Sequence, residues 1–164
     1  MESVVLYGLR TGDWIPLIER WKEACLQSFA TLPDLPEPLK VSEYAKKHDI
    51  SVKEARKQLQ MLEYLELSRQ YFVQFHPCIL KLMNLARKHE QKYKVRISVV
   101  SLINGIRKLK TCEILEPTSK EITRVLGPYT AQKLISLGII KAIELPHTYK
   151  RCKVLYYATN ILRT

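Results

Sequence analysis

Histidine and cysteine, the residue types that most often bind metals or act as general bases, are scattered through this sequence. The histidines show neither HxH nor HExxH spacing and stand at His48, His76, His89 and His147. The cysteines are 53, 34 and 40 residues apart, so no two of them form a zinc-ligand pair or a thiol redox motif. We therefore expect no metal, no cofactor and four reduced thiols in an intracellular protein.

The sequence also shows no recognisable arrangement of catalytic residues. The acidic residues lie at the spacing of helix surfaces and form no evident pair, and five glycines provide no phosphate-binding loop. We expect no enzyme and assign no catalytic residue. The first residues lack a basic leader followed by an apolar run, and no segment approaches the ~20 apolar residues of a membrane span. We expect a cytoplasmic protein that is neither exported nor membrane-spanning.

The basic residues are the group with a clear chemical meaning. The chain has 27 Lys and Arg against 16 Asp and Glu, for a formal charge of +11. Residues 1–78 carry a net charge of −1, residues 79–110 carry +8 and residues 111–164 carry +4. Clustered Lys and Arg gain affinity for phosphates by releasing counterions. The sequence therefore indicates a polyanionic partner that is contacted mainly by the middle and the last third of the chain.

The sequence of the first half of the chain predicts a helix, then a stiff connector, then a group of short elements. Apolar residues recur at three- and four-residue steps over residues 13–29, which is typical of an amphipathic helix. Trp14 and Trp21 on this helix belong either to the core or to a partner surface. Prolines keep residues 32–39 extended. Three short elements follow. They are a helix over 41–48, a helix that is capped by Ser51 and Glu54 and reaches about Leu65, and a strand over 71–75.

The second half repeats this order after a basic stretch. We expect a helix over 78–92 that ends in basic residues, and another over 98–109. Thr118 and Glu121 cap a short helix that stops at Gly127, and a further helix runs from about Tyr129 to Gly138. Two strands, over 139–145 and 154–158, form a hairpin with a basic and aromatic tip.

The order of helix, short helix, turn, capped helix and strand or hairpin thus occurs twice, at about 13–76 and 98–160. Residues 55–69 (ARKQLQMLEYLELSR) resemble the recognition helix and first wing strand of the winged helix-turn-helix superfamily, and residues 118–158 resemble the same family. The resemblance implies a mainly α fold with small β-hairpins (α+β). We expect an N-terminal unit over 1–77, a basic helical linker over 78–97 and a second winged-helix unit over 98–164.

This resemblance implies that the second helix of each copy, the basic linker and the C-terminal wing contact DNA. In the first copy the expected contacts are Lys53, Arg56, Lys57 and Gln60. In the linker they are Arg87, Lys88, Lys92, Lys94 and Arg96. In the second copy they are Tyr129, Thr130, Gln132, Lys133, Tyr149, Lys150 and Arg151, with Ser136 and His147 beside them.

We therefore expect a double-stranded DNA-binding protein, such as a transcriptional regulator or a plasmid or viral replication or partition factor. Tandem winged helices also serve as protein-interaction scaffolds, and the basic middle is compatible with RNA binding, so both alternatives stay open. The nearly neutral N-terminal half, with its two tryptophans, suggests docking to a second copy of the chain.

Overall fold

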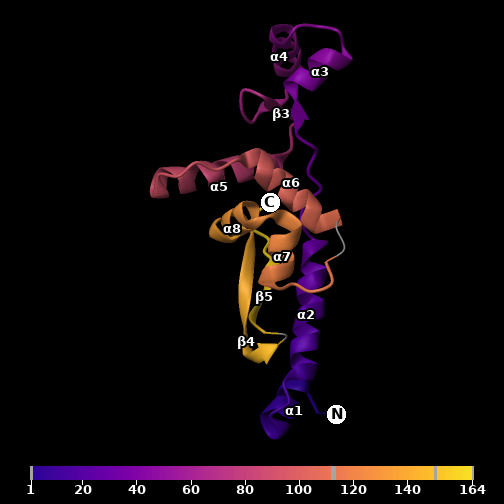
Figure 1. The fold of residues 1–164 in the computed structure, drawn as a ribbon, viewed down its shortest axis with the longest axis vertical. Coiled ribbons are helices and arrows are strands. Elements are labelled where there is room, and N and C mark those ends of the chain that lie inside the picture. Colours follow the sequence, from indigo (N-terminus) through magenta and orange to yellow (C-terminus); the bar gives the residue numbers. More distant parts are fainter. Residues whose placement is uncertain (1, 112–113, 150, 164) are drawn as a thin grey trace. The chain divides into compact units, whose positions relative to one another are not determined.

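The computed structural model describes residues 2–111, 114–149 and 151–163 as a mixed α+β fold, which confirms the expected class (Figure 1). The chain divides into two compact units. Unit 1 combines Met1–Leu32 with Lys108–Ile161, and unit 2 combines Pro33–Arg107 with Leu162–Thr164. Each unit contains a pair of helices that precedes a hairpin, but both expected segments, 13–76 and 98–160, are divided between the two units.

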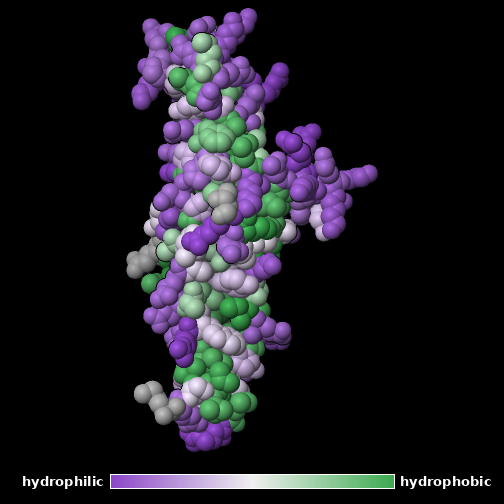
Figure 2. Space-filling view, turned by 180° about the vertical axis from the view of Figure 1, so that it is seen from behind, coloured by the Kyte–Doolittle hydropathy of each residue, from purple (hydrophilic) through white to green (hydrophobic). Residues whose placement is uncertain are grey.

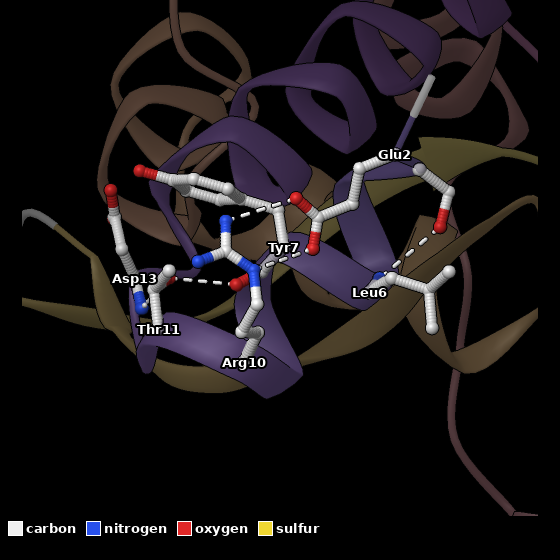
Figure 3. A network of polar contacts seen from close by, with 7 residues as sticks. Glu2, Leu6, Tyr7, Arg10, Thr11 and Asp13 are labelled. Atoms are coloured by element: carbon white, nitrogen blue, oxygen red, sulfur yellow. Dashed lines mark hydrogen bonds and ion pairs between the residues drawn. The ribbon is translucent and has the colours of Figure 1, made fainter.

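Unit 1 begins with α1 (Val4–Thr11) and α2 (Ile15–Phe29). The hydroxyl of Ser3 accepts the amide of Leu6 at 3.1 Å and caps α1. Arg10 donates to both carboxylate oxygens of Glu2, at 2.9 and 3.0 Å (Figure 3). The sequence patterns did not predict α1, because Gly8, which has no side chain to mark an apolar stripe, is its one buried residue among those described.

The C-terminal part of unit 1 holds two helices and a hairpin. They are α7 (Ser119–Leu126), α8 (Pro128–Ser136), β4 (Ile140–Tyr149) and β5 (Cys152–Ala158). The hydroxyl of Thr118 accepts the amide of Glu121 at 3.4 Å, as the expected cap requires. The hairpin is longer than expected, because Tyr149 still pairs with Cys152 and leaves a connection of two residues.

The core of unit 1 joins α2 to the hairpin. It contains Ile18, Cys25, Leu145, Tyr149 and Leu155, against which Trp14 and Trp21 pack half-buried. The amide of Ala158 also donates to the hydroxyl of Ser28 at 2.8 Å. The tryptophan-bearing helix therefore packs with the C-terminal hairpin, whereas the sequence-based boundaries grouped it with residues 30–77. Spacing showed that α2 has a buried face, but not which segment covers it.

Unit 2 begins with a three-stranded antiparallel sheet and two helices. These elements are β1 (Leu39–Lys40), α3 (Val41–Lys47), α4 (Val52–Met61), β2 (Leu65–Glu66) and β3 (Tyr71–Val73). The strand order is β1-β3-β2, so β3 lies in the middle. The core cluster of Val41, Ala45, Ala55, Leu59 and Phe72 joins both helices to this sheet. The strand predicted over 71–75 is thus present, although it is shorter.

Helix α4 begins where the sequence predicts but ends earlier than predicted. The hydroxyl of Ser51 accepts the amide of Glu54 at 3.1 Å, as predicted. The helix was expected to reach about Leu65 but ends at Met61. Glu63 adopts a left-handed φ of 62°, which reverses the chain and places Leu65 in β2.

The remaining helices are α5 (Pro77–Tyr93) and α6 (Val99–Thr111), and the division between the units passes through α6. The first turns of α5 bury Cys78, Ile79, Leu82 and Ala86. The segment predicted to be a basic linker over 78–97 therefore has a buried first half, and all of it belongs to unit 2.

Candidate nucleic-acid interface

The face of α4 opposite the core carries three of the four side chains expected to contact DNA. Ala55 and Leu59 are fully buried and fix the orientation of the helix. Lys53, Lys57 and Gln60 are exposed and follow one another at four- and three-residue steps, so they share one face. This face presents two ammonium groups and one amide to solvent.

Arg56, the fourth residue of this set, has a different role. Its guanidinium donates to the carboxylate of Glu66 at 2.5 Å and to the carbonyl of Arg69 at 2.5 Å. Its Cζ also lies 5.7 Å from the centroid of the Phe72 ring. Arg56 thus joins α4 to the hairpin of unit 2. These contacts occupy two of its five N–H donors within the protein, and the expected contact of Arg56 with DNA stays a prediction.

In unit 1, α8 has a comparable exposed row. Tyr129, Gln132 and Ser136 are exposed and Lys133 is half-buried, and their three- and four-residue steps place them on one face. The ammonium of Lys133 lies 5.6 Å from the centroid of the Tyr129 ring. Thr130 is only 9% exposed and faces the interior, so its expected contact with DNA is wrong. Its neighbour Ala131 is buried as well.

The hairpin of unit 1 contains a tyrosine whose expected role is wrong. Tyr149 is 5% exposed and packs in the core, and its hydroxyl donates to the carboxylate of Glu19 on α2. Burial, followed by this hydrogen bond, raises the pKa of Tyr149. Tyr149, which was expected to contact DNA, is therefore a core residue. Strand alternation does not reveal this burial, because residues 146–148 before Tyr149 are all exposed and the pairing of the strands is irregular between Glu144 and Tyr149.

A lysine continues the polar network around Tyr149. Lys22 lies 3.5 Å from Glu19 and 3.3 Å from Glu116. Burial alone would lower the pKa of Lys22, but the hydrogen bond and the charge of Glu116 raise it overall. The network fixes the hairpin to α2 with polar contacts in addition to the apolar core.

The turn and outer surface of the hairpin are basic. Arg151 is exposed at the turn with a left-handed φ of 64°, a conformation that two-residue hairpin turns require. Lys150, which was also expected to contact DNA, lies outside the described residues. The exposed Lys141 and Lys153 on the strands were missed, although both stand in the segments that predicted the hairpin. His147 is exposed near the turn.

The second half of α5 carries the remaining predicted contacts. Arg87, Lys88, Lys92, Lys94 and Arg96 are all exposed, as expected. Basic side chains near the C-terminus of a helix interact favourably with its dipole, which helps the helix to continue past its buried portion. Figure 2 shows hydrophilic side chains over this part of α5.

Charge divides unevenly between the units. Unit 2 has 15 basic and 8 acidic residues for a net charge of +7, and unit 1 has 12 and 8 for a net charge of +4. Within residues 2–111, 114–149 and 151–163, no group of His, Cys, Asp and Glu is arranged to hold a metal ion. In the same residues no helix combines the length and apolar character needed to cross a membrane.

Comparisons with known proteins add no relatives. No protein-family model matches the chain, and no curated protein or solved structure matches it. The exposed faces of α4, α5 and α8 and the hairpin of unit 1 are therefore the features that bear on function.

Proposed function

We propose that the chain is a non-enzymatic, double-stranded DNA-binding protein built from two winged helix-turn-helix units. One observation carries the proposal: in both units, the helix that precedes the hairpin has a row of polar and basic side chains that are exposed or half-buried. The rows are Lys53, Lys57 and Gln60 on α4, and Tyr129, Gln132, Lys133 and Ser136 on α8. The major groove of B-DNA admits an α-helix, and lysine and glutamine are side chains that bind base edges or phosphates there.

The net charge of each unit supports the same partner. Both units are positive, and the basic side chains in or near the proposed interface are mostly exposed. Each phosphate that they neutralise releases counterions, so the affinity must fall steeply with salt concentration. A scaffold that bound neutral protein surfaces through the same helices would lack this dependence.

The test is a titration of the full chain against labelled duplex DNA at several salt concentrations. We expect log K to fall linearly with log salt, with a slope of about −0.9 for each phosphate contacted. Lys53→Ala and Lys57→Ala should each reduce the magnitude of this slope by about 0.9. Arg10→Ala is the matched control, because Arg10, on α1, is already paired with Glu2 and lies outside the proposed interface.

Residues that read bases should behave differently from residues that bind phosphates. Gln132→Ala on α8 should change the ranking of duplex sequences, whereas Arg151→Ala at the hairpin turn should weaken binding to all of them about equally. Affinity that is absent at low salt or insensitive to salt contradicts the proposal. Tighter binding to duplex RNA than to duplex DNA favours the RNA alternative instead.

A further inference from the structure

Helix α5 consists of a buried part and an exposed part. Its residues Cys78, Ile79, Leu82 and Ala86 are buried, whereas none of residues 87–96 is buried. In Figure 1 the second half of α5 extends away from the sheet and the other helices of unit 2. We call residues 87–96 the α5 arm.

The apolar stripe of α5 does not stop where the burial stops. Ile79, Leu82 and Ala86 are separated by three and four residues, and His89 and Tyr93 continue the same alternation. His89 is half-buried, and Tyr93 is 56% exposed. A large aromatic side chain therefore lies exposed on the arm, beyond the buried part of α5.

The Tyr93 ring is supported by neighbours on its own helix. The His89 ring lies with its centroid 4.6 Å from that of Tyr93, at an interplanar angle of 42°. The ammonium of Lys92 lies 5.2 Å from the centroid of Tyr93. Tyr93 thus combines a large exposed area with a cation held beside its ring.

The charged side chains around Tyr93 indicate which kind of ligand the arm would bind. Arg87, Lys88, Lys92, Lys94 and Arg96 are exposed on the arm. Glu90 is the single acidic residue of this segment, and its carboxylate accepts the amide of Ile97 at 3.1 Å. An exposed aromatic ring among five positive charges complements a ligand that has both phosphates and planar rings.

We propose that the α5 arm binds unpaired nucleotides, with a base stacked on Tyr93 and the adjoining phosphates contacted by the basic side chains. This inference rests on the proposed DNA binding and adds a preference for DNA that carries a single-stranded segment. In an intact duplex the base faces are stacked on one another, so Tyr93 finds no partner there. Stacking of one base on an aromatic side chain corresponds to about a tenfold gain in affinity.

The experiment compares a blunt duplex with the same duplex carrying a short single-stranded DNA tail, using the full chain and fluorescence anisotropy. The wild-type chain should bind the tailed duplex about tenfold more tightly. Tyr93→Ala should remove this difference and leave the affinity for the blunt duplex nearly unchanged. Tyr93→Phe keeps the ring and should retain the difference. Val95→Ala, at another exposed apolar residue of the arm, should also retain it.

Equal wild-type affinity for the two duplexes overturns the inference while leaving the proposed function intact, provided that the blunt duplex is bound. A Tyr93→Ala variant that keeps the full preference overturns it as well, and so does a larger gain from an RNA tail than from a DNA tail. Binding of the tail alone without binding of the blunt duplex supports the arm and contradicts the proposed duplex function. Circular dichroism of each variant establishes that it is folded.

Discussion

The two units have the same order of helix, helix and hairpin, but they stabilise the hairpin in different ways. In unit 1 the strands are ten and seven residues long, and they pack on α2, which lies more than a hundred residues away in the sequence. In unit 2 the hairpin strands are two and three residues long, and the strand with which they form a sheet and the core cluster around Phe72 lie within residues 39–72. One hairpin depends on distant contacts and the other on local ones.

The comparison also concerns two of the residues that were expected to contact DNA. Arg56 in unit 2 and Tyr149 in unit 1 both connect a hairpin to a helix, Arg56 through Glu66 and the Arg69 carbonyl, and Tyr149 through Glu19. Both side chains have the polar groups that also suit nucleic-acid recognition. The type of a residue alone therefore does not identify a ligand contact. The hydrogen-bond partners of its side chain within the protein must be known as well.

The largest expected effect tests whether the hairpin of unit 1 depends on α2. Ile18 is fully buried beside Leu155, so Ile18→Ala should lower the free energy of unfolding by about 2–5 kcal/mol. Hydrogen exchange should show faster exchange of the amides in β4 and β5, with the amides of β3 less affected. Leu59→Ala in the core of unit 2 is the control and should give the opposite pattern. The same exchange pattern in both variants contradicts separate stabilisation.

A smaller effect is expected for the residue that anchors the hairpin of unit 2. Arg56→Ala loses two hydrogen bonds at a partly exposed site and should cost about 1–2 kcal/mol in urea unfolding. Since Arg56 is engaged within the protein, the salt slope of DNA binding should stay unchanged. A slope reduced as much as that of Lys57→Ala would show that Arg56 contacts phosphate after all.

The corresponding change in unit 1 should be smaller still. Tyr149→Phe removes one hydroxyl and its hydrogen bond to Glu19, which should cost about 1 kcal/mol. The ring remains in the core, so the hairpin keeps its packing. Chemical denaturation of Tyr149→Phe, of Glu19→Ala and of the double variant measures the coupling between the two groups. Additive effects of the two substitutions argue against this link.

The smallest effect concerns pH. Burial raises the pKa of the Cys25 thiol from 9.0 to about 11. The raised value means that the folded state disfavours the thiolate, so this contribution to stability is fully present below pH 9 and is lost as the pH rises from 9 to 11. Unfolding experiments across this range should show a decline that is shallower in Cys25→Ala. Rapid alkylation of Cys25 in the folded chain at pH 8 contradicts its burial.

Local signals in the sequence determined much of the secondary structure. Apolar spacing predicted α2, α5 and α8, and the caps at Ser51 and Thr118 predicted the starts of α4 and α7. These features depend on contacts within a few residues, so they are visible in the sequence itself. The exposure of Lys53, Lys57 and Gln132 followed from the same spacing.

Only the tertiary structure decided which segments cover one another. It placed α2 with β4 and β5, made α5 part of unit 2 and buried Thr130 and Tyr149. Apolar spacing defines a face that must be buried, but many segments of similar composition satisfy that requirement. The choice among them depends on shape and on particular long-range contacts, such as those of Ser28 with Ala158 and of Glu19 with Tyr149. Such contacts join residues far apart in the chain, and therefore no local pattern reveals them.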